Sequence, residues 1–342
     1  MSFIAPQRTS DDTCLNRSRR RILRGVRSLA AAAGLMLAFG AQAAYPDKPI
    51  QLIISFPPAG ATDVLARYVG QALSVELGQP VVVNNRPGAG GAIGLVAAAR
   101  SAPDGYHLYL AATTNQAIAA SVYSNQAANL ITDFVPIAGV GIAPHALVVP
   151  ITLPVKSAAE LIAYIKADPG KYNFASQGTG TLSHLEAELF VKENGLRITH
   201  VPYKGSSQAL PDVVNGSSIM MFDSIAGSSS LVQAGKLKFL AVASNSRTTT
   251  LPNVPTLAEA GVKNVAADNL FGVLAPKGTP QPIIDRLSKA LEHVLADKDL
   301  QAKLASQGAE LRFMPAAEFG KTIVEEHRYW GDVVRAAKVN VN

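Results

Sequence analysis

The chain has 342 residues, of which 48% are hydrophobic and 16% charged. This composition excludes a disordered chain and allows a sizeable core, and a single long apolar stretch, near the N-terminus, excludes a protein with several membrane spans. The formal net charge of +6 comes almost entirely from the first 43 residues, which hold seven arginines and two aspartates. The remaining 299 residues carry only +1, so the charge does not support nucleic-acid binding.

The N-terminal segment has the pattern of an export signal. Residues 17–24 are basic, residues 29–39 form an apolar run, and Ala43 ends a small-x-small cleavage site. We therefore predict a signal peptide over residues 1–43, cleaved near Ala43, and a periplasmic mature protein. A single membrane anchor is less favoured, because the run is shorter than the ~20 apolar residues of a span. The basic segment also resembles a twin-arginine signal, so general secretory and twin-arginine export both stay open.

The chain has one cysteine, Cys14, which lies inside the predicted signal peptide. Cleavage removes it, so the mature chain has no thiol. This excludes disulfides, thiolate catalysis and cysteine metal sites in the mature protein.

The first elements of the mature chain alternate between strand and helix. Residues 50–56 form a continuous apolar run, typical of a strand buried on both faces, and a proline pair breaks it. Thr62 is a candidate N-cap for a helix whose apolar residues recur at helical spacing. Two further strands are expected at 80–84 and 106–112. This β-α-β order predicts a parallel sheet with helices on its faces.

A second α/β unit follows a long apolar, β-like stretch at 133–150. Its expected elements are a helix at 158–166, a strand at 172–175, a helix at 182–194, a strand at 198–201, a helix at 208–215, a strand at 218–222, a helix at 230–234 and a strand at 238–243. Residues 269–275 are again β-like, and helices follow from Pro280 onward. Strands at 134–149 and 269–275 that cross between two lobes predict a hinged shape that closes on a ligand.

Two loops share a design that suits an anionic ligand. Residues 56–63 and 175–183 each follow an expected strand, contain small residues and open an expected helix. Small residues let a ligand approach the backbone, and a helix N-terminus offers free N–H groups and partial positive charge. One such loop in each lobe suits a ligand with acid groups at both ends. Hydroxyl groups that can add donors are those of Thr62, Ser176, Thr179 and Thr181.

Enzymatic and metal sites find little support in the sequence. The glycine-rich residues 88–94 lack the acidic partner of a dinucleotide site, no G-x-S-x-G elbow is present, and the six histidines show no metal-ligand spacing. His184, just after the second loop, is favoured as a helix-start residue over a ligand contact. Asp223 can bind a ligand amine or hydroxyl or orient a helix terminus, and Lys204 is either a solvated cation or a ligand contact; these alternatives stay open.

A series of short motifs, in order along the mature chain, resembles one known family. They are Tyr45-Pro46, Phe56-Pro57-Pro58-Ala59-Gly60, Asn85-Arg86-Pro87-Gly88-Ala89-Gly90-Gly91, Asp104-Gly105-Tyr106, Ala175-Ser176 with Gly178 and Gly180-Thr181, His200-Val201-Pro202-Tyr203-Lys204-Gly205, Phe222-Asp223, Leu251-Pro252-Asn253-Val254-Pro255-Thr256, and Ala275-Pro276 with Gly278-Thr279-Pro280. Together they resemble the extracytoplasmic solute receptors of tripartite tricarboxylate transporters, also called Bug receptors.

The resemblance implies an α/β, two-lobed, periplasmic-binding-protein-like fold of type II, each lobe a mainly parallel sheet flanked by helices, joined by crossing strands. We place lobe 1 at residues 44–144 plus 270–342 and lobe 2 at residues 145–269, with the ligand cleft between them. The resemblance implies no catalysis, cofactor or metal, and implies delivery of a small carboxylate to the membrane permease subunits of a tripartite tricarboxylate transporter. We expect a monomer. The ligand-binding residues implied are Phe56, Ala59, Gly60, Thr62, Asp63, Ser176, Gly178, Thr179, Gly180, Thr181 and Asp223.

Three departures from the family pattern leave the ligand open. Ala59 stands where a glycine pair is usual, Asn115 begins a segment where the family often has Thr-His-Ala, and Leu270 stands where an aromatic residue is frequent. Two other classes of function stay open beside the solute receptor. One is an exported hydrolase or cofactor-containing oxidoreductase, and the other is a ligand sensor for a signalling partner.

Overall fold

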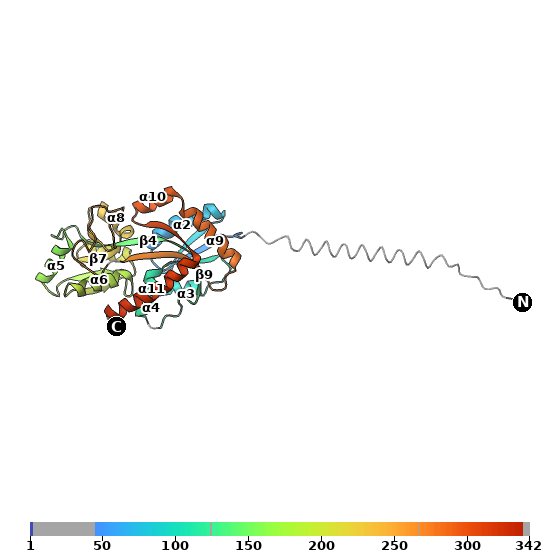
Figure 1. The fold of residues 1–342 in the computed structure, drawn as a ribbon, viewed down its shortest axis with the longest axis horizontal. Coiled ribbons are helices and arrows are strands. Elements are labelled where there is room, and N and C mark those ends of the chain that lie inside the picture. The colour runs from blue at the N-terminus through green and yellow to red at the C-terminus, as the bar shows by residue number, and fades with distance from the viewer. Residues whose placement is uncertain (3–44, 124, 266, 338–342) are drawn as a thin grey trace. The chain divides into compact units, whose positions relative to one another are not determined.

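The strands between Ile50 and Pro315 join in one sheet, with helices packed around it (Figure 1). The computed structural model describes residues 1–2, 45–123, 125–265 and 267–337, and within these ranges ten strands form one sheet. Its order is β2-β1-β3-β9-β4-β7-β5-β6, with β10 and β8 also paired with β4. The expected α/β class is confirmed. The predicted signal peptide lies outside the described residues, apart from Met1 and Ser2.

The first α/β part is built as the apolar runs predict. Its elements are β1 (Ile50–Ile54), α2 (Ala61–Leu77), β2 (Val81–Asn85), a 3-10 turn (Ala89–Gly91), α3 (Ala92–Ala99), β3 (His107–Ala112) and α4 (Thr113–Val122). Strand β1 pairs in parallel with β2 and β3, and its apolar residues are buried. Helix α2 buries Leu65, Val69 and Leu73 and ends at Gly78, whose φ of 68° is left-handed. The expected N-cap at Thr62 is wrong, because the helix begins two residues earlier with Gly60 as its N-cap.

Two long strands, β4 (Phe134–Pro150) and β9 (Asp268–Pro276), run antiparallel through the middle of the sheet (Figure 1). Residues 134–144 of β4 pair with β9, whereas residues 145–150 pair with β7 (Met220–Ser224) and β8 (Leu237–Val242). Strand β10 (Glu310–Pro315) pairs with the first half of β4. Strand β4 therefore belongs to both halves of the sheet.

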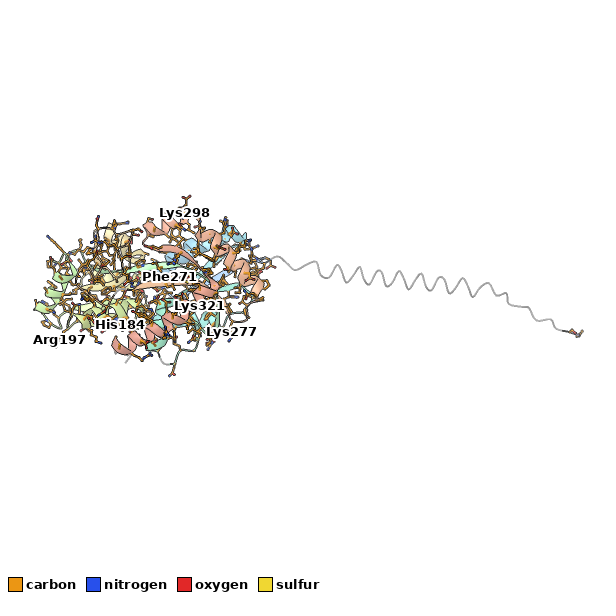
Figure 2. The ribbon with its side chains drawn as sticks, viewed as in Figure 1. His184, Arg197, Phe271, Lys277, Lys298 and Lys321 are labelled. Carbon is orange, nitrogen blue, oxygen red and sulfur yellow. The ribbon has the colours of Figure 1, made fainter. Side chains whose placement is uncertain are left out.

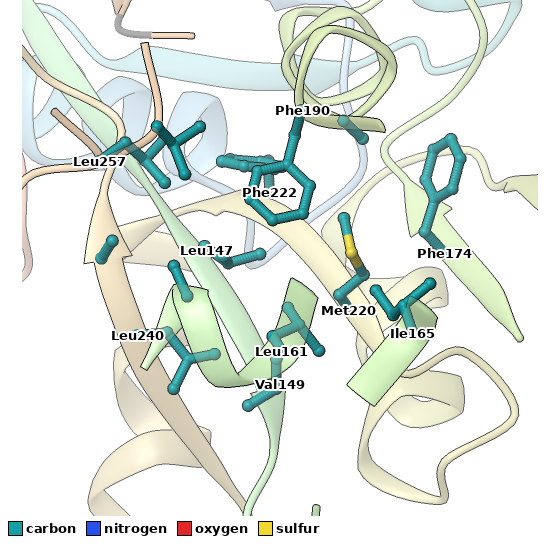
Figure 3. Packing of buried hydrophobic residues seen from close by; sticks show 14 of the residues in the cluster. Leu147, Val149, Leu161, Ile165, Phe174, Phe190, Met220, Phe222, Leu240 and Leu257 are labelled. Atoms are coloured by element: carbon teal, nitrogen blue, oxygen red, sulfur yellow. The ribbon is translucent and has the colours of Figure 1, made fainter. Parts of the chain in front are cut away.

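The second α/β part repeats the alternation of strand and helix. Its elements are α5 (Ala158–Ala167), β5 (Asn173–Ser176), α6 (Leu182–Glu193), β6 (Thr199–Pro202), α7 (Ser206–Val214), β7, α8 (Ile225–Gln233) and β8. Strand β5 pairs in parallel with β6 and β7. In the hydrophobic core of this second part, Phe174, Phe190 and Phe222 pack together with Leu147 and Val149 of β4 (Figure 3).

The C-terminal part is helical apart from β10. It comprises α9 (Gln281–Leu295), α10 (Lys298–Ser306) and α11 (Ala316–Ala337). Trp330 of α11 is buried in one cluster with Ile118 of α4 and Leu185 of α6, so the last helix contacts both halves of the molecule. Phe271 of β9 lies inside, whereas charged residues such as Lys298 lie on the outside (Figure 2). None of the helices in the described ranges has both the length and the apolar character that crossing a bilayer requires.

Some elements differ from those that the sequence predicts. Helix α4 begins with Thr113, Thr114 and Asn115, which have low helix propensity, and it forms because all three are buried against neighbouring elements. Helix α8 starts five residues before the expected 230–234 segment, because Ser224 caps it by accepting a hydrogen bond from Gly227 N. Helix α10 and strand β10 were not predicted.

Candidate functional site

The loop after β1 is fixed by Asp63. Its carboxylate accepts hydrogen bonds from Arg67 Nε at 2.8 Å, Asn85 Nδ2 at 2.9 Å and Ala59 N at 3.1 Å. Burial raises the pKa of Asp63, but the hydrogen bonds from Arg67 and Asn85 outweigh burial, so the pKa lies below its ordinary value. Asp63 therefore holds the loop in shape, and its carboxylate is already satisfied by the protein.

The same loop leaves the start of α2 open. Gly60 is extended at φ −87° and ψ 170°, and no side chain caps the helix. The first helical bond runs from Val64 N to Gly60 O at 3.0 Å. The N–H groups of the first turn have no such intrahelical acceptor, and they carry the positive end of the helix dipole. This helix start is therefore able to bind an anion.

Ala59, just before it, has a left-handed φ of 68°. This conformation costs an L-residue about 1–2 kcal/mol, whereas glycine adopts it freely at the cost of more entropy on folding. We expect Ala59→Gly to raise the free energy of unfolding by up to about 1 kcal/mol, measured by urea titration. The matched control Ala72→Gly, inside α2, should lower it by about 1 kcal/mol. A destabilised Ala59→Gly protein would show that the left-handed residue is not strained.

The loop after β5 satisfies most of its own polar groups. Ser176 Oγ lies 2.7 Å from His200 Nε2 and accepts a hydrogen bond from Gly178 N. Thr181 Oγ1 donates to Gly178 O at 2.7 Å and caps α6, while Leu182 N donates to Asn115 Oδ1 at 2.7 Å. The start of α6 is therefore engaged within the protein, unlike the start of α2.

Between the two loops lies a small space, the inner cavity, of about 10 Å³. That volume holds roughly one water molecule. The residues that line it are Phe56, Pro57, Gly60, Ala61, Thr62, His145, Gln177, Gly205, Ser206, Ser224 and Asn269. The open start of α2 therefore borders a small cavity, and its residues Gly60, Ala61 and Thr62 are buried.

Buried polar atoms without partners surround this cavity. His145 Nε2 and Asn269 Oδ1 are buried and have no hydrogen-bond partner, and both residues line the cavity. Asp223 lies just behind, where its Oδ1 accepts from Ser206 Oγ at 2.6 Å and Gln177 Nε2 at 2.7 Å while its Oδ2 has no partner. Burial raises the pKa of Asp223. Because a buried unpaired polar group costs about 1–3 kcal/mol, these atoms indicate a site for a polar ligand or for water.

A larger space, the outer groove, adjoins the inner cavity and has a volume of about 320 Å³. The two share Phe56 and Gln177 in their linings. Lys204 is the one charged residue among the groove's lining residues, which are Ser55, Phe56, Gly88, Ala89, Gly90, Gly91, Tyr123, Gln177, Gly178, Thr179, Pro202, Tyr203, Lys204 and Gln208. The groove thus has room for a small organic ligand and offers a cation on its wall.

The residues predicted for the site fall into two groups. Phe56, Gly60, Thr62, Gly178 and Thr179 line the inner cavity or the outer groove, and Asp223 supports the cavity through Ser206 and Gln177. The others are not brought to either space by the structure. Ala59 is exposed, and Asp63 is bound to Arg67. The hydroxyl of Ser176 contacts His200 and Gly178, and the hydroxyl of Thr181 donates to Gly178 O. Gly180 packs close to Tyr123.

Several lining residues were not predicted. Gln177 lies inside the predicted second loop but was not singled out, although an amide in a glycine-rich loop is a signal that was available. His145 and Asn269 lie on β4 and β9, and Ser206 begins α7. These three come from elements far apart in the sequence, so no local pattern marks them as neighbours.

The structure also brings together His184, Glu188 and His200, whose ligand atoms lie within 4.8 Å of one another. Sequence spacing did not reveal this group, because His200 belongs to β6 and the other two to α6 (Figure 2 labels His184). The two imidazoles stack with centroids 4.1 Å apart and planes at 16°. Near-parallel rings do not aim their lone pairs at one ion, and His184 Nδ1 accepts from Gly180 N at 3.4 Å. We therefore describe the group as a ring stack that supports the second loop.

Comparison with known proteins identifies the family. Residues 65–339 match the family described as "Tripartite tricarboxylate transporter family receptor". The chain is 38% identical to protein BugT of Bordetella pertussis over 316 residues, which cover 92% of this chain and 97% of BugT.

Solved structures agree in fold. The Rhodopseudomonas palustris protein Rpa4515 with adipate superposes with a TM-score of 0.84 at 32% identity, over 86% of this chain and 99% of that one. MatC of the same organism, with bound malate, superposes with a TM-score of 0.80 at 29% identity, over 85% of this chain and all of that one. The expected periplasmic-binding-protein-like fold is confirmed by these neighbours. The chain belongs to the receptor family of tripartite tricarboxylate transporters, whose members are solute-binding proteins.

Proposed function

We propose that this protein is a periplasmic receptor that binds a small carboxylate at the start of α2 and delivers it to the permease of a tripartite tricarboxylate transporter. The observation that carries the proposal is the uncapped start of α2, which faces an inner cavity lined by unpartnered buried polar atoms. Gly60, Ala61 and Thr62 supply the backbone on one side, and Gln177 and Ser206 supply polar side chains on the other.

Backbone donors suit a receptor that must release its ligand. The first-turn N–H groups and the helix dipole attract a carboxylate, and such an interaction is worth about 0.3–1 kcal/mol at an exposed site and up to about 2 kcal/mol when partly buried. No arginine or lysine lines the inner cavity within the described residues. Binding there can be selective for carboxylates without the strong bidentate hydrogen bonds that a buried arginine would form.

The outer groove supports a ligand longer than a single carboxyl group. Its 320 Å³ adjoin the inner cavity, and Lys204 on its wall can attract a second acid group. The related structures hold adipate and malate, which are both dicarboxylates. We propose a dicarboxylate of this size as the ligand class, with one carboxylate at α2 and the rest of the molecule in the outer groove.

We propose that binding involves movement of two lobes, with residues 44–144 plus 270–342 in one and residues 145–269 in the other. The change of partners along β4 after Pro144 supports this boundary. Tyr123 Oη donates to Thr179 O at 3.0 Å across the proposed cleft. Because the inner cavity holds only about one water, these contacts have to part before a carboxylate can enter.

The test is thermal unfolding of the purified protein against adipate, malate, citrate, aspartate, glutamate, nicotinate, benzoate and terephthalate. A ligand at ~100 times its dissociation constant adds about 2.7 kcal/mol, which raises the midpoint of a chain this long by several degrees. We expect a shift with the dicarboxylates. No shift with any carboxylate, for a protein shown by mass spectrometry to carry no retained ligand, would contradict the proposal.

A further inference from the structure

His145 is a buried imidazole with one free nitrogen at the inner cavity. It has no exposed surface, and its Nδ1 lies 2.7 Å from Oε2 of Glu186 on α6. Its Nε2 is buried without a hydrogen-bond partner, and the residue lines the cavity together with Gly60, Ala61 and Thr62 at the start of α2. One imidazole nitrogen therefore belongs to a buried pair and the other to the proposed carboxylate site.

Acidic groups surround this imidazole. Glu186 faces it from α6, Asp223 from β7 and Asp268 from β9. Asp223 and Asp268 are held by other donors, since Ser206 donates to the first and Ser244 to the second. Glu186 is also fully buried, and its Oε1 has no partner. The surrounding carboxylates therefore favour the neutral, protonated form of the His145–Glu186 pair over the form with a net charge of −1.

The direction of the pKa shifts agrees with this geometry. Burial lowers the pKa of His145, but the nearby Glu186, Asp223 and Asp268 carboxylates outweigh burial and leave it above its ordinary value. Burial raises the pKa of Glu186, against the opposing effect of His145. Both shifts mean that the pair holds its extra proton up to a higher pH than the two isolated groups would.

The protonation of the pair decides what the inner cavity offers to a ligand. When His145 is neutral and Glu186 ionised, the ring hydrogen on Nδ1 faces Glu186, the pair carries −1, and Nε2 presents a lone pair. A carboxylate is then repelled. One more proton, on either partner, makes the pair neutral overall and places a hydrogen on Nε2, which can donate to a carboxylate oxygen.

We propose that His145 is a ligand-contacting residue that donates its Nε2–H to the bound carboxylate, so that binding is linked to uptake of a proton by the His145–Glu186 pair. This inference rests on the proposed function, and it adds a charged-group contact from β4 to the backbone donors at the start of α2. It also assigns Glu186 as a positioning residue, which orients the ring and sets the charge of the pair without reaching the ligand.

The test is isothermal titration calorimetry with adipate and malate, which both stay ionised between pH 6.5 and pH 8.5. For the unmodified protein we expect binding at least tenfold weaker at pH 8.5 than at pH 6.5. Titrations at pH 8.5 in EPPS and in Tris, which differ in ionisation enthalpy, should show uptake of close to one proton per ligand bound.

Two matched variants test whether the proton is taken up by the His145–Glu186 pair. Glu186→Gln keeps the shape and the contact with Nδ1 but removes the acid, so its affinity should change less than threefold between the two pH values, with no net uptake. Glu193→Gln makes the same change at the exposed end of the same helix and should keep the full pH dependence. A pH dependence that survives in Glu186→Gln would overturn the assignment.

The remaining outcomes separate the two proposals. Equal affinity at both pH values without proton uptake overturns the role of His145 and leaves the carboxylate receptor standing. Tighter binding at pH 8.5 also overturns it, because the ligand would then prefer the pair without its extra proton. If no carboxylate of the panel stabilises the protein, the proposed function itself fails, and this inference fails with it.

Discussion

Gly60→Leu is expected to weaken carboxylate binding more than 100-fold without unfolding the protein. A Cβ atom at Gly60 would meet only Pro57 O and Ser206 Oγ, both at 3.9 Å, and the backbone there is extended at φ −87°, so any residue fits. The rest of a leucine side chain has to enter the inner cavity, which holds about one water. It would cover the N–H groups at the start of α2 and exclude the carboxylate.

The matched control for this prediction is Gly60→Ala. Both variants replace glycine at the N-cap, which lowers the free energy of unfolding by about 1 kcal/mol, so they share that cost. Alanine adds only the Cβ atom, and we expect it to keep affinity within about tenfold of the unmodified protein. Affinity is measured by calorimetry and folding by circular dichroism. A Gly60→Leu protein that binds as tightly as Gly60→Ala would place the site elsewhere.

Glu326→Gln is expected to stabilise the protein at pH 8 by up to about 3 kcal/mol. Glu326 of α11 is partly buried, and its carboxyl group accepts from Thr113 Oγ1 at 2.7 Å and Thr114 Oγ1 at 2.5 Å. Burial raises the pKa of Glu326 from 4.5 to about 7, against the opposing hydrogen bonds. At 1.36 kcal/mol per pKa unit, this shift is worth at most about 3 kcal/mol.

The sign of the pH dependence follows from the raised pKa. The folded protein keeps the proton of Glu326 that the unfolded chain loses, so the stabilising contribution is complete below about pH 4.5 and is lost as the pH rises through about 7. Glutamine has the shape of the protonated acid and does not titrate, so the advantage of the variant should grow over this range. Urea unfolding at pH 5, 6, 7 and 8 measures it.

The control is Glu325→Gln, one residue earlier on the exposed face of α11. It removes the same charge from the same helix, and its effect should stay within about 0.5 kcal/mol at every pH. The titration of the His145–Glu186 pair remains in both variants and does not alter the comparison. A Glu326→Gln protein that is less stable than the unmodified protein at pH 8 would show that the carboxylate is held in its ionised form.

This partly buried acid also links the last helix to β9 through Thr113 and Thr114 of α4. Thr114 Oγ1 accepts from Leu270 N at 3.0 Å, and Thr113 Oγ1 is 3.2 Å from Leu270 O. Leu270 lies near the start of β9, in the segment where a hinge was predicted. A change in the protonation of Glu326 would therefore alter the hydrogen bonds that join α4, α11 and β9.

The fold was predictable where a local pattern reports burial. Residues 50–54 are apolar apart from Gln51 because β1 is covered on both faces, and residues 134–150 are apolar apart from His145 because β4 runs through the middle of the sheet. Helix α4 was not predictable in this way. Its first turn of Thr113, Thr114 and Asn115 favours other conformations, and only tertiary contacts such as those with Glu326 and Leu182 make it a helix.

The site was predictable in part. The loop at Gly60 carries its signal locally, because a small residue directly before a helix start is what an anion site needs. The polar residues on the opposite side of the inner cavity carry no such local signal. His145 is a single polar residue within an apolar strand, and Asn269 and Ser206 join it only through the pairing of β4 with β7 and β9 and the packing of α7. Such long-range contacts leave no trace in the spacing of residues.

The second loop shows the limit of reading a motif. Its glycines and hydroxyls have the composition of an anion-binding loop, yet Ser176 and Thr181 satisfy groups within the loop, and Asn115 takes the N–H of Leu182. A side-chain hydroxyl next to a helix start serves equally well as a cap, and the sequence does not distinguish the two uses.

The most direct test of the proposed site is a crystal structure of the protein with the carboxylate that stabilises it most. We predict that one carboxylate lies with its oxygens within hydrogen-bond distance, about 2.7–3.2 Å, of the backbone nitrogens of Ala61 and Thr62. The inner cavity should be widened around it, with the rest of the ligand in the outer groove. A ligand bound without contact to residues 60–62 would contradict the assignment of the α2 start as the carboxylate site.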